Sequence, residues 1–244
     1  MNVKGFKICA ISVNLLLYLV VISSWHDAGV DAQTTSQQTE RFDSIVREDF
    51  FAGMFGDTAR LDKGMKYCEA VLAKDPKHAE ALVWHGGGML ARSAISYRNG
   101  DSTAGKLQWE QGLDEMNEAV KYAPDDIGVK IGRSATLIGL AQSGWNSQDA
   151  QARELLRSAL DDYEFVYRSQ EKEFSDVDLH SRGELLFGLA SGWSILGDHE
   201  KTRQYLELIK IWCKGSRYDT EARQWLVGKP RVVTHDCTGC HISR

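Results

Sequence analysis

Proline is scarce in this chain, with three residues in 244. Because proline interrupts helices and central strands, this scarcity leaves long stretches free to be regular. In those stretches apolar residues recur at three- and four-residue spacing, which is typical of amphipathic helices. The composition is otherwise that of a globular protein, with 43% hydrophobic and 26% charged residues. The expected fold class is therefore all-α.

An excess of charge of one sign is also lacking. The 29 basic and 34 acidic residues give a formal net charge of −5 and are spread along the chain. Nucleic-acid binding needs a basic patch, so we predict no nucleic-acid partner. The sequence contains no Walker loop, no dinucleotide fingerprint and no His-Glu-x-x-His zinc motif. With no acid–base or nucleophile constellation in the central part of the chain, we predict that the protein is not an enzyme.

One glycine-rich segment, His85-Gly86-Gly87-Gly88, matches the oxyanion loop of some lipases and esterases. Those enzymes also need a Gly-x-Ser-x-Gly nucleophile elbow, which this sequence lacks. The glycines lie within a helical pattern, where each costs about 1 kcal/mol relative to alanine. We therefore expect them to permit close packing between helices.

Long hydrophobic runs are missing except near the N-terminus, where residues 8–22 are almost entirely apolar. Lys4 and Lys7 precede this run, and a polar stretch with small residues follows it up to Ala32. Because this is the layout of a secretory signal peptide, we predict that residues 1–32 are removed by cleavage after Ala32. A retained anchor is the alternative, although the run is short for spanning a bilayer. We expect a periplasmic or otherwise exported protein with no membrane span after cleavage.

Beyond a polar stretch at residues 33–41, expected to be a flexible linker, four segments in residues 42–227 share one layout. Each has a helix with small residues in its middle, a short turn and a second helix. The clearest spans residues 188–210 and turns at Gly197-Asp198. The expected core positions of its two helices are Leu189, Ala190, Trp193, Tyr205, Leu206 and Ile209.

The other segments are less regular. The first segment turns at Gly56-Asp57 and closes at Asp75-Pro76. The expected core positions of its first helix are Phe51, Ala52 and Phe55, at the same spacing as Leu189, Ala190 and Trp193. The second unit closes at Pro124, 48 residues after Pro76, so we predict an insertion within residues 98–108. The third unit has no closing proline and a long predicted second helix.

These segments resemble the tetratricopeptide repeat (TPR), a helix–turn–helix unit of about 34 residues. The resemblance is carried by the large–small–aromatic positions of the first helix, the Gly-Asp turn and the closing Asp-Pro. It implies TPR-like stacked helix pairs, an α-solenoid in which neighbouring pairs bury a continuous core. It also implies a protein or peptide partner bound on the concave face. Small residues expected to allow close approach of helices are Ala52, Gly86, Gly132 and Ala190.

Several residues that could carry chemistry are expected to be structural. Cys68 and Cys213 are predicted to be buried as small hydrophobes, and nothing in the sequence brings them together. His180 and His85 could serve a cofactor together, but no spacing supports the pairing. The histidines expected at helix ends are His78, His180 and His199. The tryptophans expected in the core are Trp84, Trp109, Trp145, Trp193, Trp212 and Trp225.

An irregular tail is predicted for residues 228–244, and it carries Cys237-Thr238-Gly239-Cys240-His241. This C-x-x-C-H spacing resembles the haem-attachment motif of c-type cytochromes. The resemblance implies that Cys237 and Cys240 bind haem c through thioether bonds and that His241 is an axial ligand of the iron. Attachment of this kind takes place outside the cytoplasm, which agrees with the predicted export.

The motif departs from the cytochromes in its position. Cytochrome c domains usually carry it near their N-terminus, whereas only three residues follow it in this chain. The distal ligand is unassigned, because His235 is too close in sequence to reach around the same haem. Three alternatives stay open: a disulfide between Cys237 and Cys240, a vestigial motif, or Zn²⁺ held by these cysteines with His235 and His241.

We therefore predict an exported TPR-like scaffold whose haem serves electron transfer or redox sensing with a partner protein. A plain TPR-type binding module without haem is the alternative.

Overall fold

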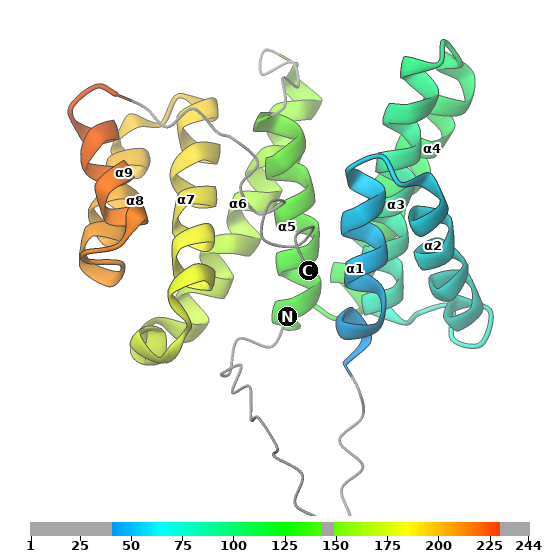
Figure 1. Ribbon diagram of the computed structural model, residues 1–244, viewed down its shortest axis with the longest axis horizontal. Helices are drawn as coiled ribbons and strands as arrows, with labels where there is room; N and C mark the ends of the chain where they lie inside the picture. The colour runs from blue at the N-terminus through cyan, green and yellow to red at the C-terminus, as the bar shows by residue number, and fades with distance from the viewer. Residues whose placement is uncertain (1–40, 143–148, 230–244) are drawn as a thin grey trace, which may run out of the picture.

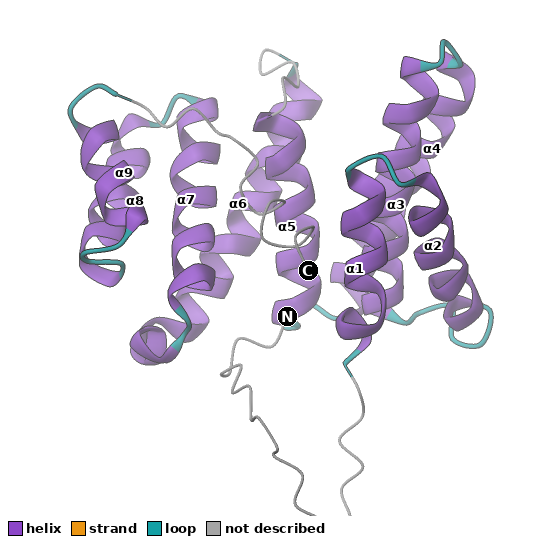
Figure 2. Ribbon diagram, viewed as in Figure 1, coloured by secondary structure: helices purple, strands orange, loops and turns teal. Residues whose placement is uncertain are grey.

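The computed structural model describes residues 41–142 and 149–229. Within these two ranges the regular structure is entirely helical, without a strand (Figure 2). None of the described helices is both long enough and apolar enough to cross a bilayer. The elements are α1 (Phe42–Met54), α2 (Thr58–Leu72), α3 (Ala79–Arg98), α4 (Ser102–Tyr122), α5 (Ile127–Gln142), α6 (Ala150–Gln170), the 3₁₀ helix η1 (Glu171–Asp176), α7 (Leu179–Leu196), α8 (His199–Trp212) and α9 (Arg217–Leu226).

The helices form pairs that stack in chain order. Helices α1 and α2, α3 and α4, α5 and α6, and α7 and α8 pack as neighbours, and α9 packs on α8. In Figure 1, α1 to α4 lie together at one end of the molecule, and α8 and α9 lie at the other. The first helices of the pairs, α1, α3, α5 and α7, contact one another in succession. The predicted all-α, solenoid-like stack of helix pairs is confirmed.

The second helix of each pair begins at an aspartate. Its carboxylate accepts a hydrogen bond from the backbone N–H three residues later, which satisfies one of the donors that a helix start leaves unpaired. The four pairs of cap and donor are Asp57 and Arg60, Asp101 and Ala104, Asp149 and Ala152, and Asp198 and Lys201. Gly56 and Gly197 precede two of these caps with φ of +105° and +81°, a conformation that glycine adopts without strain. The predicted Gly-Asp turns are confirmed.

The second pair has longer helices than the first. Helices α3 and α4 have 20 and 21 residues, against 13 and 15 in α1 and α2, and only residues 99–101 connect them. The second unit is thus longer than the first, as predicted, and its extra length lies in the two helices that meet at residues 99–101. Gly100 turns the chain with φ of +84°, and Asp101 caps α4 at once, so the extra residues lengthen both helices instead of forming a loop.

Glycines bring α3 and α4 into backbone contact. A Cβ added to Gly86 would lie 2.7 Å from the carbonyl oxygen of Gly112, and one added to Gly112 would lie 2.7 Å from that of Gly86. A Cβ on Gly88 would collide with Met65 and Phe50 of the first pair. The glycine run therefore serves close packing, as predicted, and lies within a helix where no oxyanion loop could form.

The core runs along the whole stack in two clusters, a smaller one over α1 to α3 and a larger one from α3 to α9. Trp193 is 6% exposed, and the other predicted core tryptophans pack against these clusters, except Trp145, which lies outside the described residues. Phe55 differs, because α1 ends before it and leaves it 44% exposed, while Phe50 is buried in its place. The predicted core positions of the fourth pair are all buried: Leu189, Ala190, Trp193, Tyr205, Leu206 and Ile209.

Candidate functional sites

The predicted haem site lies outside the described residues. Cys237, Cys240 and His241 belong to the segment 230–244, as does His235, and the predicted signal peptide belongs to the segment 1–40. The described part of the chain contains α9, the helix from which the tail starts. It also contains three polar clusters that the sequence did not predict.

Two cysteines are buried in the stack as free thiols. Cys68 in α2 is 0% exposed, and Cys213 at the end of α8 is 1% exposed. Burial raises the pKa of Cys68 to about 12 and that of Cys213 to about 11. Since the thiolate is the reactive form of cysteine, both thiols are inert at neutral pH. They lie in the first and fourth pairs, and each behaves as a small buried hydrophobe, as predicted.

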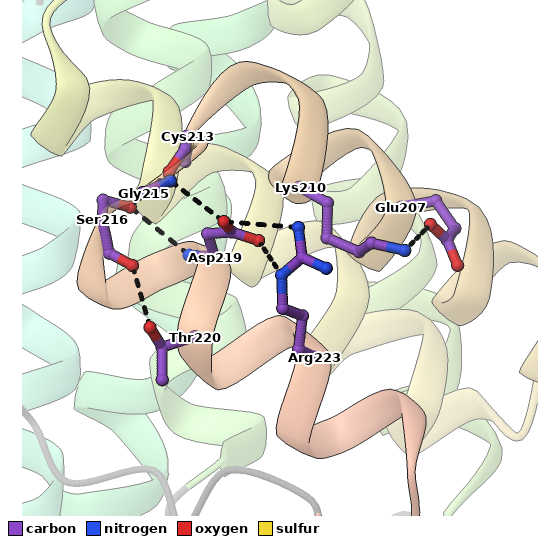
Figure 3. Close-up of polar contacts among 8 residues, drawn as sticks. All are labelled: Glu207, Lys210, Cys213, Gly215, Ser216, Asp219, Thr220 and Arg223. Carbon is purple, nitrogen blue, oxygen red and sulfur yellow. Dashed lines mark hydrogen bonds and ion pairs between the residues drawn. The ribbon is translucent and has the colours of Figure 1, made fainter.

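The turn between α8 and α9 is fixed by a compact set of hydrogen bonds (Figure 3). The Asp219 carboxylate accepts from the Gly215 backbone N–H at 2.9 Å and from Arg223 Nε at 2.7 Å. Ser216 Oγ donates to the Cys213 carbonyl at 2.6 Å and accepts from the Asp219 N–H at 3.3 Å. The bond from Gly215, helped by Arg223, holds the pKa of Asp219 below its ordinary value. These contacts set the direction in which α9 leaves α8.

This turn places Tyr218 against the start of α7. The Tyr218 side chain packs on Gly183, where a Cβ would come within 2.5 Å of the ring. Its hydroxyl lies 2.8 Å from Glu184 Oε1, 2.9 Å from His180 Nδ1 and 3.2 Å from Arg217 Nη2. Tyr218 is 3% exposed, and burial raises the pKa of its hydroxyl well above the ordinary value. The hydroxyl therefore stays protonated, while His180 remains exposed.

A second cluster surrounds His85 in the second pair. His85 Nδ1 lies 2.5 Å from Glu115 Oε2, and its Nε2 lies 3.7 Å from Glu69 Oε1. The other Glu115 oxygen accepts from Gln111 Nε2 at 2.9 Å. His85 and His180 thus have separate partners in different pairs, and the structure does not bring them together. Across residues 41–142 and 149–229, no group of three or more His, Cys, Asp or Glu side chains could hold a metal ion.

A third cluster lies at the junction of the second and third pairs. Asp162 of α6 accepts from Lys130 Nζ at 2.8 Å and from Arg133 Nε at 2.7 Å, both from α5. Arg133 Nη1 also donates to Asn117 Oδ1 of α4 at 3.0 Å. The side chains of Lys130, Arg133 and Asp162 are 10%, 11% and 5% exposed. Two nearly buried cations thus share one carboxylate.

These clusters are hard to predict from the sequence, because their members are far apart along the chain. Tyr218 is 38 residues from His180, and Asp162 is 32 residues from Lys130. The one available signal was a charged residue on an otherwise apolar helix face, as at Lys130. The helix-end histidines are confirmed: His78 caps α3 by accepting from the Ala81 N–H, His180 lies in the first turn of α7, and His199 begins α8.

Comparison with known proteins gives no match, since no family model, no curated protein and no solved structure is significantly similar to this chain.

Proposed function

We propose that this protein is an exported TPR-like scaffold that binds a protein or peptide partner and carries a covalently attached haem c. The haem is bound through Cys237 and Cys240, with His241 as an axial iron ligand, and serves electron transfer or redox sensing with the partner. The repeat assignment and the haem have separate support.

The repeat assignment is supported by the regular order of the helix pairs. The first helices contact one another in succession, and each second helix begins at an aspartate cap. Stacked pairs of this kind have a continuous face made by their first helices, on which an extended segment of a partner can lie. This face is the proposed partner surface.

The haem assignment is carried by the donor set of the terminal motif, two thiols and an imidazole at haem-attachment spacing. The described cysteines support it, because Cys68 and Cys213 are buried with raised pKa values and do not compete for the haem vinyl groups. Of the five cysteines, Cys9 lies in the segment predicted to be removed. When bound, the haem supplies one-electron redox chemistry.

The test is expression of the full chain with a cytochrome c maturation system. We expect a Soret absorbance that stays with the protein after acid–acetone extraction and disappears in the Cys237→Ala/Cys240→Ala variant. Cys213→Ala removes a buried thiol and serves as the matched control, which should keep the haem. A wild type that is colourless under these conditions contradicts the haem assignment.

A plain binding module without haem is the second candidate. It is supported by the two buried apolar clusters that hold the described helix pairs and α9 together. This candidate predicts a folded but colourless protein from the same expression. Mass spectrometry for a disulfide between Cys237 and Cys240, together with zinc analysis, then distinguishes its structural and metal-binding forms.

A further inference from the structure

We propose that Asn99, in the turn between α3 and α4, is a modification site whose side-chain amide is lost by deamidation when the turn opens. The reaction is spontaneous and needs only water. It is independent of the haem and goes beyond the proposed function, because it concerns how the second helix pair ages. Three features of the turn lead to it: the Asn99-Gly100 pair, the exposure of both residues and the hydrogen bonds that close the turn.

The pair Asn99-Gly100 is the reactive element. The backbone nitrogen that follows an asparagine can attack the side-chain carbonyl carbon and form a five-membered cyclic imide. A bond then forms between Gly100 N and Asn99 Cγ, the Asn99 Cγ–Nδ2 bond breaks, and the Gly100 N–H proton ends on the leaving group, which departs as ammonia. Water opens the imide at either carbonyl, giving aspartate or isoaspartate. Glycine favours the attack, because it has no Cβ to hinder its nitrogen.

Both residues of the pair are exposed to water. Figure 1 shows their turn at the tip of the α3–α4 pair, so water and bases reach the amide. Asn117, the other asparagine in the described part of the chain, is placed differently. It precedes Glu118 inside α4, and its Oδ1 accepts a hydrogen bond from Arg133 Nη1 at 3.0 Å. Asn99 is therefore the reactive asparagine of the helical stack.

The folded turn holds the pair in an unreactive shape. Ring closure needs the Asn99 Cβ and the Gly100 nitrogen to eclipse each other about the Cα–C bond. Asn99 has φ of −82° and ψ of 0°, so its own backbone nitrogen, and not its Cβ, eclipses the Gly100 nitrogen. The Gly100 N–H also donates to the Tyr97 carbonyl at 3.1 Å. The turn has to open before Asn99 can react.

Hydrogen bonds on both sides of the pair keep the turn closed. The Asn99 N–H donates to the Ile95 carbonyl at 3.0 Å, and the Asp101 N–H donates to the Ser96 carbonyl at 2.9 Å. Asp101 Oδ1 accepts from the Ala104 N–H at 2.9 Å as the cap of α4. Opening the turn breaks these bonds together. Since local opening and closing are fast compared with deamidation, the open fraction of the turn sets the reaction rate.

The products cannot restore this turn. Isoaspartate carries the main chain through the former side chain, which adds a methylene to the short connection between α3 and α4. The contacts beside the turn are close, because the Tyr97 ring lies 2.9 Å from a Cβ built on Gly105, and Ser93 Oγ donates to the Gly105 carbonyl at 2.7 Å. Aspartate places a negative charge at the C-terminal end of α3, which the helix dipole disfavours. Deamidation of Asn99 therefore loosens the tip of the second pair irreversibly.

The test compares the folded full chain with the same chain in urea during incubation in neutral buffer. Trypsin cuts after Arg98 and Lys106, so mass spectrometry of the peptide 99–106 follows the amide, and an isoaspartate methyltransferase assay follows the main product. Deamidation of Asn99 should be at least about tenfold slower in the folded chain, because opening the turn gives up backbone hydrogen bonds and a cap. Asn117 is the internal reference and should keep its amide in the folded chain.

Asp101→Ala tests whether this turn is the gate. Loss of such a cap favours the open turn about fivefold, so the folded variant should deamidate about fivefold faster than the folded wild type. In urea the two should react at the same rate. Asp57→Ala is the matched control, because it removes the equivalent cap from the first pair, where Asp57 accepts from the Arg60 N–H. It should leave the rate at Asn99 unchanged, and circular dichroism checks that both variants are folded.

The effect on the fold is read from aged protein. Wild type incubated until Asn99 has reacted should unfold at lower urea than fresh protein, whereas Asn99→Gln, whose longer side chain closes a ring far more slowly, should not change on incubation. An amide at Asn99 that persists in urea overturns the modification site. Equal rates in the folded and urea-unfolded wild type, or equal effects of Asp101→Ala and Asp57→Ala, overturn its control by the turn.

Discussion

At the scale of single residues, the absence of a side chain matters as much as its presence. Gly86 and Gly112 allow the α3 and α4 backbones to touch, with 2.7 Å between each carbonyl oxygen and a Cβ built on the other glycine. The obstacle is backbone, which cannot rotate away as a flexible side chain can. The conformational cost of glycine within a helix is thus offset by packing.

Gly86→Ala is expected to destabilise the protein by about 1–3 kcal/mol, because the added methyl forces α3 and α4 apart. Gly139→Ala is the matched control: Gly139 also lies within a helix, and a Cβ there would meet nothing within 4 Å. The control should gain about 0.5–1 kcal/mol from the better helix propensity of alanine. Urea unfolding followed by circular dichroism measures both, and equal effects would contradict the close-packing role.

At the scale of elements, helices in this chain are set by their ends. Aspartate caps begin the second helices, and a Ser216–Asp219 pair begins α9, where the carboxylate also accepts from Gly215. Because Tyr218 lies inside this turn, the start of α9 decides both the position of the last helix and the hydrogen bond to His180.

Asp219→Asn is expected to lower the free energy of unfolding at pH 7 by about 1–2 kcal/mol, through loss of charge-assisted hydrogen bonds. The pKa of Asp219 is lowered in the folded state. Its stabilisation is therefore complete above the unfolded value of about 3.9 and is lost as pH falls through the lower folded value.

The difference between wild type and Asp219→Asn should accordingly shrink when urea unfolding is repeated below pH 3. Glu207→Gln, which removes a more exposed carboxylate from the neighbouring Lys210 pair, should show little effect at either pH. A gap that stays constant with pH would show that the Asp219 charge contributes nothing.

At the scale of the whole molecule, the stack is a linear array in which each helix pair packs on the next pair along the chain. The second pair packs on the third mainly through α3 and α5, and less through α4 and α5. The cluster of Lys130, Arg133 and Asp162 lies at the junction of these two pairs. Arg133 of α5 links α4 and α6, because it donates hydrogen bonds to Asn117 and to Asp162. A polar cluster thus joins α4, α5 and α6 beside the larger apolar cluster.

Asp162→Asn is expected to cost about 3–5 kcal/mol, because it leaves two nearly buried cations without a counter-charge. Asp62→Asn, which breaks the exposed pair with Arg92, should change stability by no more than about 1 kcal/mol. Chemical denaturation of the two variants measures the contrast. A small effect in both would mean that Lys130 and Arg133 find other partners or water.

Much of the fold was predictable because it depends on short-range patterns. Apolar spacing indicated the helices, and Gly-Asp pairs indicated the turns at residues 56–57 and 197–198. The spacing of two prolines indicated the extra length of the second unit, but it could not show that this length belongs to the two helices, because proline spacing does not divide a unit between helix and loop. Phe55 was misplaced for a similar reason, since the end of α1 decides whether it faces the core.

The sequence by itself determined the helical class, the helix caps and the donor set Cys237, Cys240 and His241, because each is written within a few neighbouring residues. Whether that donor set holds haem stays a prediction. Only the tertiary structure decided that Tyr218 orients His180 and that Asp162 neutralises Lys130 and Arg133. Those contacts join residues more than 25 positions apart, and no local pattern encodes which helices will lie side by side.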